Sequence, residues 1–171
     1  EQHNPKFVYL IPTFQNPSGR AMSLARREEV AAVLEETGVA LLEDNPYGRL
    51  RYEGEAAPSI ASLGNMSAQT ILLNSASKII APGLRIGWLR AEGEILKRLT
   101  IAKQAMGLQT SVPDQLVVAH YLEHGGLEGH VAELVETYRP RRDAMVNALR
   151  AVLPSRRPSP TRRAACSAGS T

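Results

Sequence analysis

The fold class is decided by the apolar run Val39-Ala40-Leu41-Leu42, which ends in Glu43-Asp44. Such a nearly continuous run fits a strand that is buried on both faces of a sheet. Upstream of it, apolar residues recur at helical spacing between Ser23, a suitable N-cap, and Gly38, a typical C-terminal stop. A second apolar run at residues 7–12 precedes that helix and ends in a turn signal. The order strand, helix, strand predicts an α/β fold.

Further elements follow downstream. Residues 70–74 form a third buried strand, and a polar stretch before it, residues 59–69, contains a short helix by our prediction. A Pro82-Gly83 turn leads to a strand at residues 85–91, and so short a connection predicts antiparallel pairing with a neighbour. Helices are predicted at residues 95–106, 113–125 and 127–152, the last being one helix or two joined by a kink at Pro140.

Composition and charge exclude several classes of protein. The 171 residues are 43% hydrophobic, which is enough to bury a core, and no apolar stretch approaches the roughly 20 residues of a membrane span. The single cysteine, Cys166, excludes a disulfide framework within one chain. Arg156, Arg157, Arg162 and Arg163 turn a formal charge of −1 over the rest of the chain into +3. Since these arginines lie in a tail without acidic residues, the globular part has no basic character that indicates nucleic-acid binding.

Reactive side chains follow each of the first three predicted strands. Asn16 comes after the first strand, Asp44 ends the second, and Lys78 comes just after the third. Ligands of open α/β sheets bind beyond the carboxyl ends of parallel strands. Although each residue alone could be a turn former, a cap or a solvated lysine, their arrangement predicts an amide, a carboxylate and an amine at one edge of the sheet.

These residues belong to segments with a familiar pattern. Asn16-Pro17-Ser18-Gly19, Asp44-Asn45-Pro46-Tyr47, and Ser75-Ala76-Ser77-Lys78 with Arg85-Ile86-Gly87 resemble, in order and separation, the three signature segments of class I/II aminotransferases. Within that family the resemblance leans toward the 2-aminoadipate and aromatic branch, and it covers roughly residues 7–153. It implies a truncated large domain of fold type I, an α/β fold with a mixed, mostly parallel sheet sandwiched by helices.

The resemblance also implies a cofactor and a reaction. The cofactor is pyridoxal 5'-phosphate, and the reaction moves an amino group from an amino acid to a 2-oxo acid through a Schiff base on Lys78. Asp44 would keep the ring nitrogen charged, Tyr47 and Asn16 would hydrogen-bond the ring oxygen, and Ser75 and Arg85 would hold the phosphate. The predicted catalytic residue is Lys78, and the predicted cofactor-binding residues are Asn16, Asp44, Tyr47, Ser75, Lys78 and Arg85.

The chain looks like a piece of a longer protein. It opens with Glu1, and the family's phosphate-cup loop, its stacking aromatic residue and its substrate-binding arginine have no counterpart in it. We expect residues 1–126 to be part of the cofactor-binding domain, residues 127–153 to be a long helix leading toward a missing small domain, and residues 154–171 to be a disordered basic tail. The full-length protein is expected to be a cytoplasmic homodimer, and the chain alone is expected to be inactive.

Three alternatives remain open. The chain could be the pyridoxal-phosphate-binding, ligand-sensing domain of a winged-helix transcription regulator, and only then, with an upstream DNA-binding domain, would nucleic acid be a partner. It could belong to a pyridoxal-phosphate-dependent lyase. It could also be an inactive truncated product with a frameshifted tail. An upstream helix-turn-helix domain would distinguish the regulator from the enzyme.

Two clusters of charged or titratable side chains carry no functional prediction. His120 and His124 share a helix face but lack a metalloprotease pattern, so we predict no metal site there. Arg139, Arg141 and Arg142 are predicted to form the solvated face of the last helix.

Overall fold

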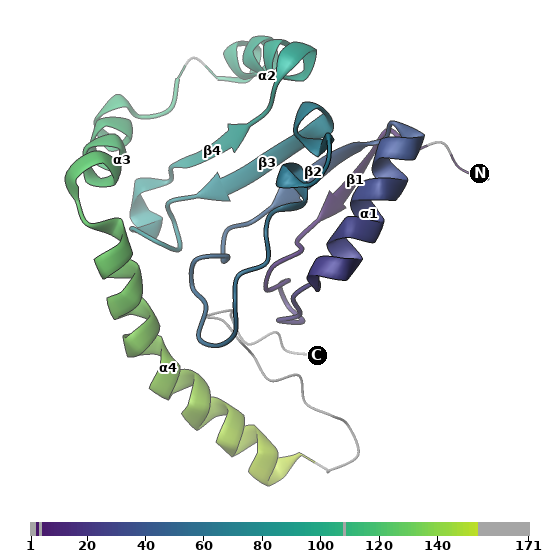
Figure 1. Cartoon of the computed structure of the whole chain (residues 1–171). Coiled ribbons are helices and arrows are strands. Elements are labelled where there is room, and N and C mark those ends of the chain that lie inside the picture. Colours follow the sequence, from purple (N-terminus) through teal and green to yellow (C-terminus); the bar gives the residue numbers. More distant parts are fainter. Residues whose placement is uncertain (1–2, 4, 108, 154–171) are drawn as a thin grey trace.

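The computed structural model describes residue 3 and residues 5–107 and 109–153, and a four-stranded sheet lies at its centre (Figure 1). The strands lie in the order β1 (Phe7–Leu10), β2 (Ala40–Asp44), β3 (Thr70–Ser75) and β4 (Gly87–Arg90). The first three are parallel, and β4 runs antiparallel to β3. The predicted mixed, mostly parallel sheet of an α/β fold is therefore confirmed, as is the antiparallel direction of the last strand.

Helix α1 (Leu24–Thr37) covers one face of this sheet, and its ends follow the predicted signals. The side chain of Ser23 caps the first turn by accepting a hydrogen bond from the Arg26 amide. At the other end, Gly38 adopts a left-handed conformation with φ of 66°, and its N–H donates to the Leu34 carbonyl at 2.9 Å. The inner side of α1 packs against β2 through a buried cluster of Ala31, Leu34, Leu41, Ile60 and Met66.

Gly38 offers a test of this helix end. Replacing Gly38 by alanine should lower the free energy of unfolding by roughly 1–2 kcal/mol, because a Cβ disfavours the left-handed backbone although nothing lies within 4 Å of it. Gly107 is the matched control, since it ends helix α2 (Gly93–Met106) with an extended backbone, φ of −173°. Urea unfolding should show a change within about 0.5 kcal/mol for Gly107→Ala. Equal losses at the two positions would contradict this explanation.

The two faces of the sheet differ in burial. Leu41 and Glu43 face α1 and are fully buried, whereas Leu42 and Asp44 on the opposite face are half-buried. Beside them on that face, Tyr9 of β1 is 49% exposed. The prediction that β2 is buried on both faces is therefore wrong for the described part of the chain, because α1 covers one face only. We call the other side, with Tyr9, Leu42 and Asp44, the open face.

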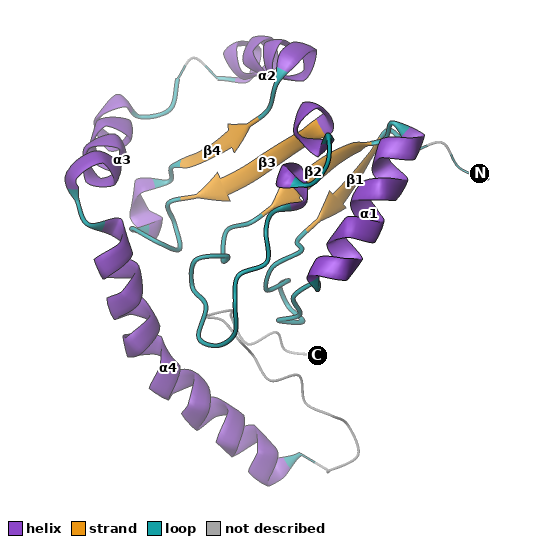
Figure 2. Cartoon of the chain, viewed as in Figure 1, coloured by secondary structure: helices purple, strands orange, loops and turns teal. Residues whose placement is uncertain are grey.

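Short 3₁₀ helices and three longer helices complete the described chain (Figure 2). The 3₁₀ helices are η1 (Ile60–Ser62), η2 (Met66–Gln69) and η3 (Pro82–Leu84), and the longer helices after the sheet are α2, α3 (Val112–His124) and α4 (Leu127–Val152). Helix α4 is one continuous helix of 26 residues with Pro140 inside it. Among the described helices, none combines the length and the apolar character that crossing a membrane requires. The predicted basic tail, residues 154–171, lies outside the described residues.

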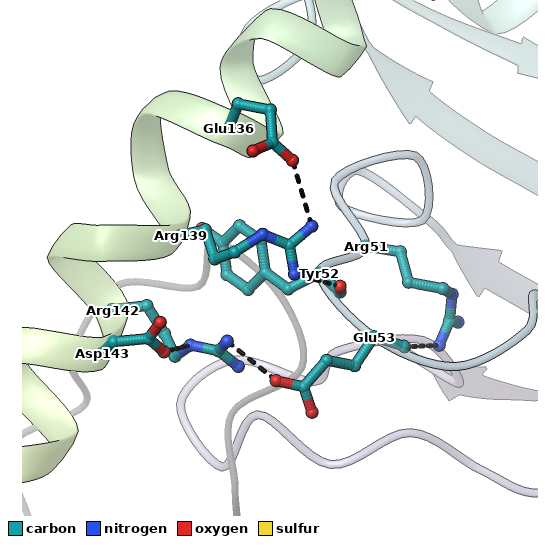
Figure 3. Close-up of polar contacts among 7 residues, drawn as sticks. All are labelled: Arg51, Tyr52, Glu53, Glu136, Arg139, Arg142 and Asp143. Carbon is teal, nitrogen blue, oxygen red and sulfur yellow. Dashed lines mark hydrogen bonds and ion pairs between the residues drawn. The ribbon is translucent and has the colours of Figure 1, made fainter.

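Two arginines of helix α4 contact a loop that is distant in the sequence (Figure 3). Arg139 donates to the Tyr52 carbonyl at 2.6 Å, and Arg142, only 9% exposed, donates to the Glu53 carboxylate at 2.8 Å. Both guanidinium groups also lie over the ring of Tyr52, at 6.0 and 5.0 Å from its centroid. The predicted solvated face is therefore wrong for these two residues, because a loop far away in sequence packs on them; Arg141 is exposed as predicted.

Candidate functional site

The predicted site residues gather at the carboxyl edge of the parallel strands. Asn16 lies in the loop after β1, Asp44 ends β2, and Ser75 ends β3. Since β1, β2 and β3 are parallel neighbours, these three positions share one edge. The pairing of Asp44 with Leu73 also places Asp44 and Ser75 on the same face of the sheet, because side chains two residues apart in a strand point to the same side.

Asp44 is held by a residue that the sequence did not indicate. The phenol of Tyr9 donates a hydrogen bond of 2.6 Å to Asp44 Oδ2, from the neighbouring strand. This hydrogen bond, with smaller effects of burial and of the nearby charges of Asp44 and Tyr47, raises the pKa of Tyr9 to about 12. The other carboxylate oxygen, Asp44 Oδ1, has no hydrogen-bond donor among the described residues.

The loop that carries Asn16 is fixed by its own backbone and by Gln15. The side-chain oxygen Oε1 of Gln15 accepts a hydrogen bond from the backbone amide of Ser18 at 3.0 Å. The backbone amide of Gln15 donates to the Arg20 carbonyl at 2.9 Å. Phe14, before them, is fully buried. The side chain of Asn16 itself is exposed at the tip of this anchored loop.

A tight turn after β2 carries Tyr47. Its start is tied to β3 by a hydrogen bond from the Asn45 amide to the Leu73 carbonyl at 3.0 Å. A Cβ at Gly48 would come 2.4 Å from Asn45 Oδ1, so any larger residue there would force the Asn45 side chain to move. Lys78 Nζ lies 5.9 Å from the centroid of the Tyr47 ring. Tyr47, in the turn after β2, and Lys78, in the turn after β3, therefore lie close to each other.

Lys78 and Ser75 lie in a compact turn between β3 and η3. Ser75 Oγ accepts from the Ser77 amide at 3.1 Å and lies 3.4 Å from the Ile86 carbonyl. A Cβ on Gly87 would come 3.2 Å from the Asn74 carbonyl, so this glycine permits β4 to lie close to β3. The turn therefore places the Ser75 hydroxyl near the start of the segment that carries Lys78.

Arg85, the last of the six predicted site residues, directly follows η3. It has a left-handed backbone with φ of 54°, and its guanidinium lies 3.4 Å from the Pro82 carbonyl. Within the described part of the chain, neither Arg85 nor Lys78 has a carboxylate partner. Two cationic groups are thus available to an anionic ligand at this edge.

The site is an open edge and not an enclosed cavity. A hollow of about 280 Å³ adjoins it, lined by Thr13, Asn45, Pro46, Arg51 and Asn74 among others. None of the six predicted cofactor-binding residues lines this hollow. The lining does include their direct neighbours in the chain, among them Asn45, Asn74 and Ile79, so the hollow adjoins the edge at which the predicted residues lie. We assign the chemistry to the edge itself.

A buried arginine fixes the segment that leads into the Asn16 loop. Arg27 of α1 is 1% exposed, and its Nη2 donates to the Pro12 carbonyl at 3.0 Å and to Thr13 Oγ1 at 2.8 Å. Its remaining nitrogens donate to the carbonyls of Met22 and Pro58. Burial lowers the pKa of Arg27, while the charge of Glu43 opposes that shift.

Glu43 has a similar role on the same side of β2, the side that faces α1. It is fully buried and accepts hydrogen bonds from Ser59 Oγ at 2.6 Å and from the amides of Ile60 and Ala61 at 3.2 and 3.0 Å. It thereby caps the start of η1. Arg27, Glu43 and Tyr9 were not predicted from the sequence. The signal that could have indicated Glu43 is its carboxylate directly after the apolar run of a buried strand.

The histidines of α3 form no part of this edge. His120 and His124 stack with ring centroids 4.7 Å apart. Within the described residues, no three histidine, cysteine or carboxylate side chains come together in a group that could hold a metal ion.

Comparison with known proteins agrees with this arrangement. The model of the family described as "Aminotransferase class I and II" matches residues 1–161. The chain is 43% identical over 149 residues to aromatic-amino-acid aminotransferase 1 of Thermococcus litoralis, a match that covers 87% of this chain and 36% of the relative. It is also 32% identical over 149 residues to YisV, an uncharacterised HTH-type transcriptional regulator of Bacillus subtilis, with coverage of 87% and 31%.

A solved structure gives the same result for the fold. LysN, the α-aminoadipate aminotransferase of Thermus thermophilus, in complex with N-(5'-phosphopyridoxyl)-L-leucine, superimposes with a TM-score of 0.86 and 32% identity. The match covers 94% of this chain and 42% of that one. The chain thus spans little more than a third of the length of the aminotransferase relative from T. litoralis.

Proposed function

Because this chain belongs to the class I and II aminotransferases, we propose that the full-length protein moves an amino group from an amino acid to a 2-oxo acid, with pyridoxal 5'-phosphate held at Lys78. The observation that carries this proposal is the meeting of Asp44, Tyr47 and Lys78 at one edge of the sheet. Lys78 Nζ lies over the Tyr47 ring and has no carboxylate partner among the described residues.

The residues at this edge fit the cofactor chemically. Pyridoxal phosphate carries a phosphate at one end and a basic ring nitrogen at the other, and when bound it supplies an electron sink for the carbon that loses a proton. Arg85 and Ser75 supply a cation and a hydroxyl for an anion, and Asp44 supplies a carboxylate oxygen for a positively charged nitrogen. Asp44 ends β2, whereas Ser75 ends β3 and Arg85 follows η3. The ring nitrogen and the phosphate of the cofactor would thus be bound by different segments of the chain.

Each residue then has a distinct role. Asp44 holds a positive charge on the ring nitrogen, because a nearby carboxylate favours the charged form of a base. Tyr47 and Asn16 would donate hydrogen bonds to the ring oxygen, and Ser75 and Arg85 would bind the phosphate. The amine of Lys78 would hold the cofactor and would accept and return the proton of the substrate α-carbon.

Substrates and assembly follow from the same proposal. The relatives named for aromatic amino acids and 2-aminoadipate support amino donors of these two kinds. We propose that residues 1–126 belong to the cofactor-binding domain, that residues 127–153 lead toward a small domain, and that the protein acts as a homodimer in the cytoplasm. The similarity to YisV supports a ligand-sensing regulator as the second candidate.

Transamination by the full-length protein is the first expected result. Incubated with pyridoxal phosphate, 2-oxoglutarate and phenylalanine, tyrosine or 2-aminoadipate, it should form glutamate and the matching 2-oxo acid in equal amounts, at rates on the order of 1–10³ per second. Chromatography of both products provides the measurement. The 171-residue chain alone is the control and should show no turnover.

Other results of this assay would indicate a lyase or a transcription regulator instead. Loss of carbon dioxide or of a side-chain group, without glutamate, would indicate a lyase. Cofactor binding without turnover of any donor, together with retarded migration of promoter DNA, would indicate a regulator. Either result would overturn the proposed transamination.

A further inference from the structure

The hydrogen bond between Tyr9 and Asp44 has no part in the roles assigned above. It is 2.6 Å long and joins neighbouring parallel strands. Tyr9 pairs with Leu42 in the register, two residues before Asp44, so both side chains stand on the open face and the long phenol reaches diagonally across to the carboxylate.

Packing does not account for this tyrosine. Its side chain is 49% exposed, and the buried cluster beneath α1 takes its β1 contributions from Val8 and Leu10 on the other face. A phenylalanine at position 9 would keep the ring in place and lose only the hydroxyl. The contact with Asp44 is therefore the specific feature that the hydroxyl provides.

The contact restricts how Asp44 can present its carboxylate. A carboxylate at a strand end rotates between several orientations unless a partner holds it. With Oδ2 engaged by Tyr9, Oδ1 is the oxygen without a hydrogen-bond donor among the described residues. A ligand that meets an already oriented carboxylate loses less conformational entropy on binding.

We propose that Tyr9 is a positioning residue that fixes the Asp44 carboxylate and leaves its second oxygen to accept a hydrogen bond from the protonated ring nitrogen of the cofactor. This inference rests on the proposed function, because it concerns the same site. Tyr9 acts through Asp44 and does not itself bind the cofactor. Removing its hydroxyl therefore has an effect only while Asp44 is present.

A double-mutant cycle on cofactor affinity tests this dependence. In the full-length protein without substrate, the dissociation constant of pyridoxal phosphate is measured by equilibrium dialysis for the wild type, Tyr9→Phe, Asp44→Ala and the double variant. Tyr9→Phe should weaken binding about 3–10-fold, the effect of one hydrogen bond. In the Asp44→Ala background the same change should have less than about a 2-fold effect. Tyr138→Phe, which removes an exposed phenol hydroxyl on α4, should leave binding unchanged.

A second measurement needs no cofactor. In protein labelled with ¹³C at tyrosine Cζ, the Tyr9 signal is assigned by its loss in Tyr9→Phe and followed from about pH 8 to about pH 11. The groups that act on Tyr9 are Asp44 and Tyr47, and the raised pKa of about 12 keeps its phenol protonated through this range. In Asp44→Ala the midpoint should fall toward about 10, so that most of the phenol ionises by about pH 11. Asp44→Asn, which keeps the side-chain volume, should also lower the midpoint and replaces the alanine variant if that one unfolds.

The outcomes separate this inference from the proposed function. Equal weakening by Tyr9→Phe in both backgrounds, or no weakening in the wild type, would overturn the positioning role while leaving the aminotransferase assignment intact. A Tyr9 signal that does not respond to loss of Asp44 would overturn it as well. If the wild type does not bind pyridoxal phosphate, both the proposed function and this inference fail, even when the titration shows the contact.

Discussion

Replacing Lys78 by arginine in the full-length protein should reduce the rate of transamination by roughly 10⁴-fold or more. Arginine keeps the positive charge at this edge of the sheet, but its guanidinium stays protonated and can neither anchor the cofactor covalently nor accept the substrate proton. The measurement is kcat with a saturating amino donor and 2-oxoglutarate.

Lys97 provides the matched control for this substitution. It is also an exposed lysine, and its amine is paired with Glu94 on α2 at 2.6 Å. Lys97→Arg should leave kcat within about 2-fold, as expected for a surface substitution away from the site. Borohydride reduction of the wild type, followed by peptide mapping, should place the cofactor label on Lys78. A label on Lys97 or Lys103, or a Lys78→Arg variant with normal kcat, would remove Lys78 from the mechanism.

Replacing Arg27 by methionine should lower the free energy of unfolding by about 3–5 kcal/mol, the range for breaking a buried charged network by removing one partner. Methionine fills much of the space but leaves the carbonyls of Pro12, Met22 and Pro58 without the donors that Arg27 supplies. It also leaves the buried charge of Glu43 less compensated. Urea unfolding of the full-length protein measures the loss.

The neighbouring arginine is a control on the same helix. Arg26 is exposed and forms an ion pair with Glu29 three residues on, at 2.6 Å. Exposed pairs of this kind contribute about 0.5 kcal/mol or less, so Arg26→Met should have little effect on unfolding. Similar losses for the two variants would show that helix propensity, and not the buried network of Arg27, determines the result.

Local signals in the sequence predicted those parts of the fold that depend on neighbouring residues. The ends of α1 follow from the side chain of Ser23 and the backbone freedom of Gly38, and both act within one turn of the helix. The positions of Asp44 and Ser75 at strand ends, and of Asn16 in the loop after β1, follow from apolar runs that stop at polar residues. Chain order along parallel strands then predicts a common edge.

The contacts that were not predicted from the sequence join residues that are distant along the chain. The contact of Tyr9 with Asp44 requires the register of β1 on β2, which no pattern within either strand determines. Arg142 was assigned to solvent because the periodicity of α4 does not reveal that Tyr52 and Glu53 pack on it. Burial of a charged residue is decided by such partners and not by its own sequence neighbours.

Arg85 shows a conflict between the preference of the backbone and the chemistry of the side chain. With φ of 54° it occupies a conformation that favours glycine, and any other residue there sacrifices roughly 1–2 kcal/mol of stability. The side chain is exposed, so burial does not compensate for this loss. The phosphate contact proposed for this guanidinium would therefore be made at a cost in stability. In relatives without the proposed phosphate site, the backbone alone would decide which residue stands here, and we expect glycine or asparagine at the position of Arg85.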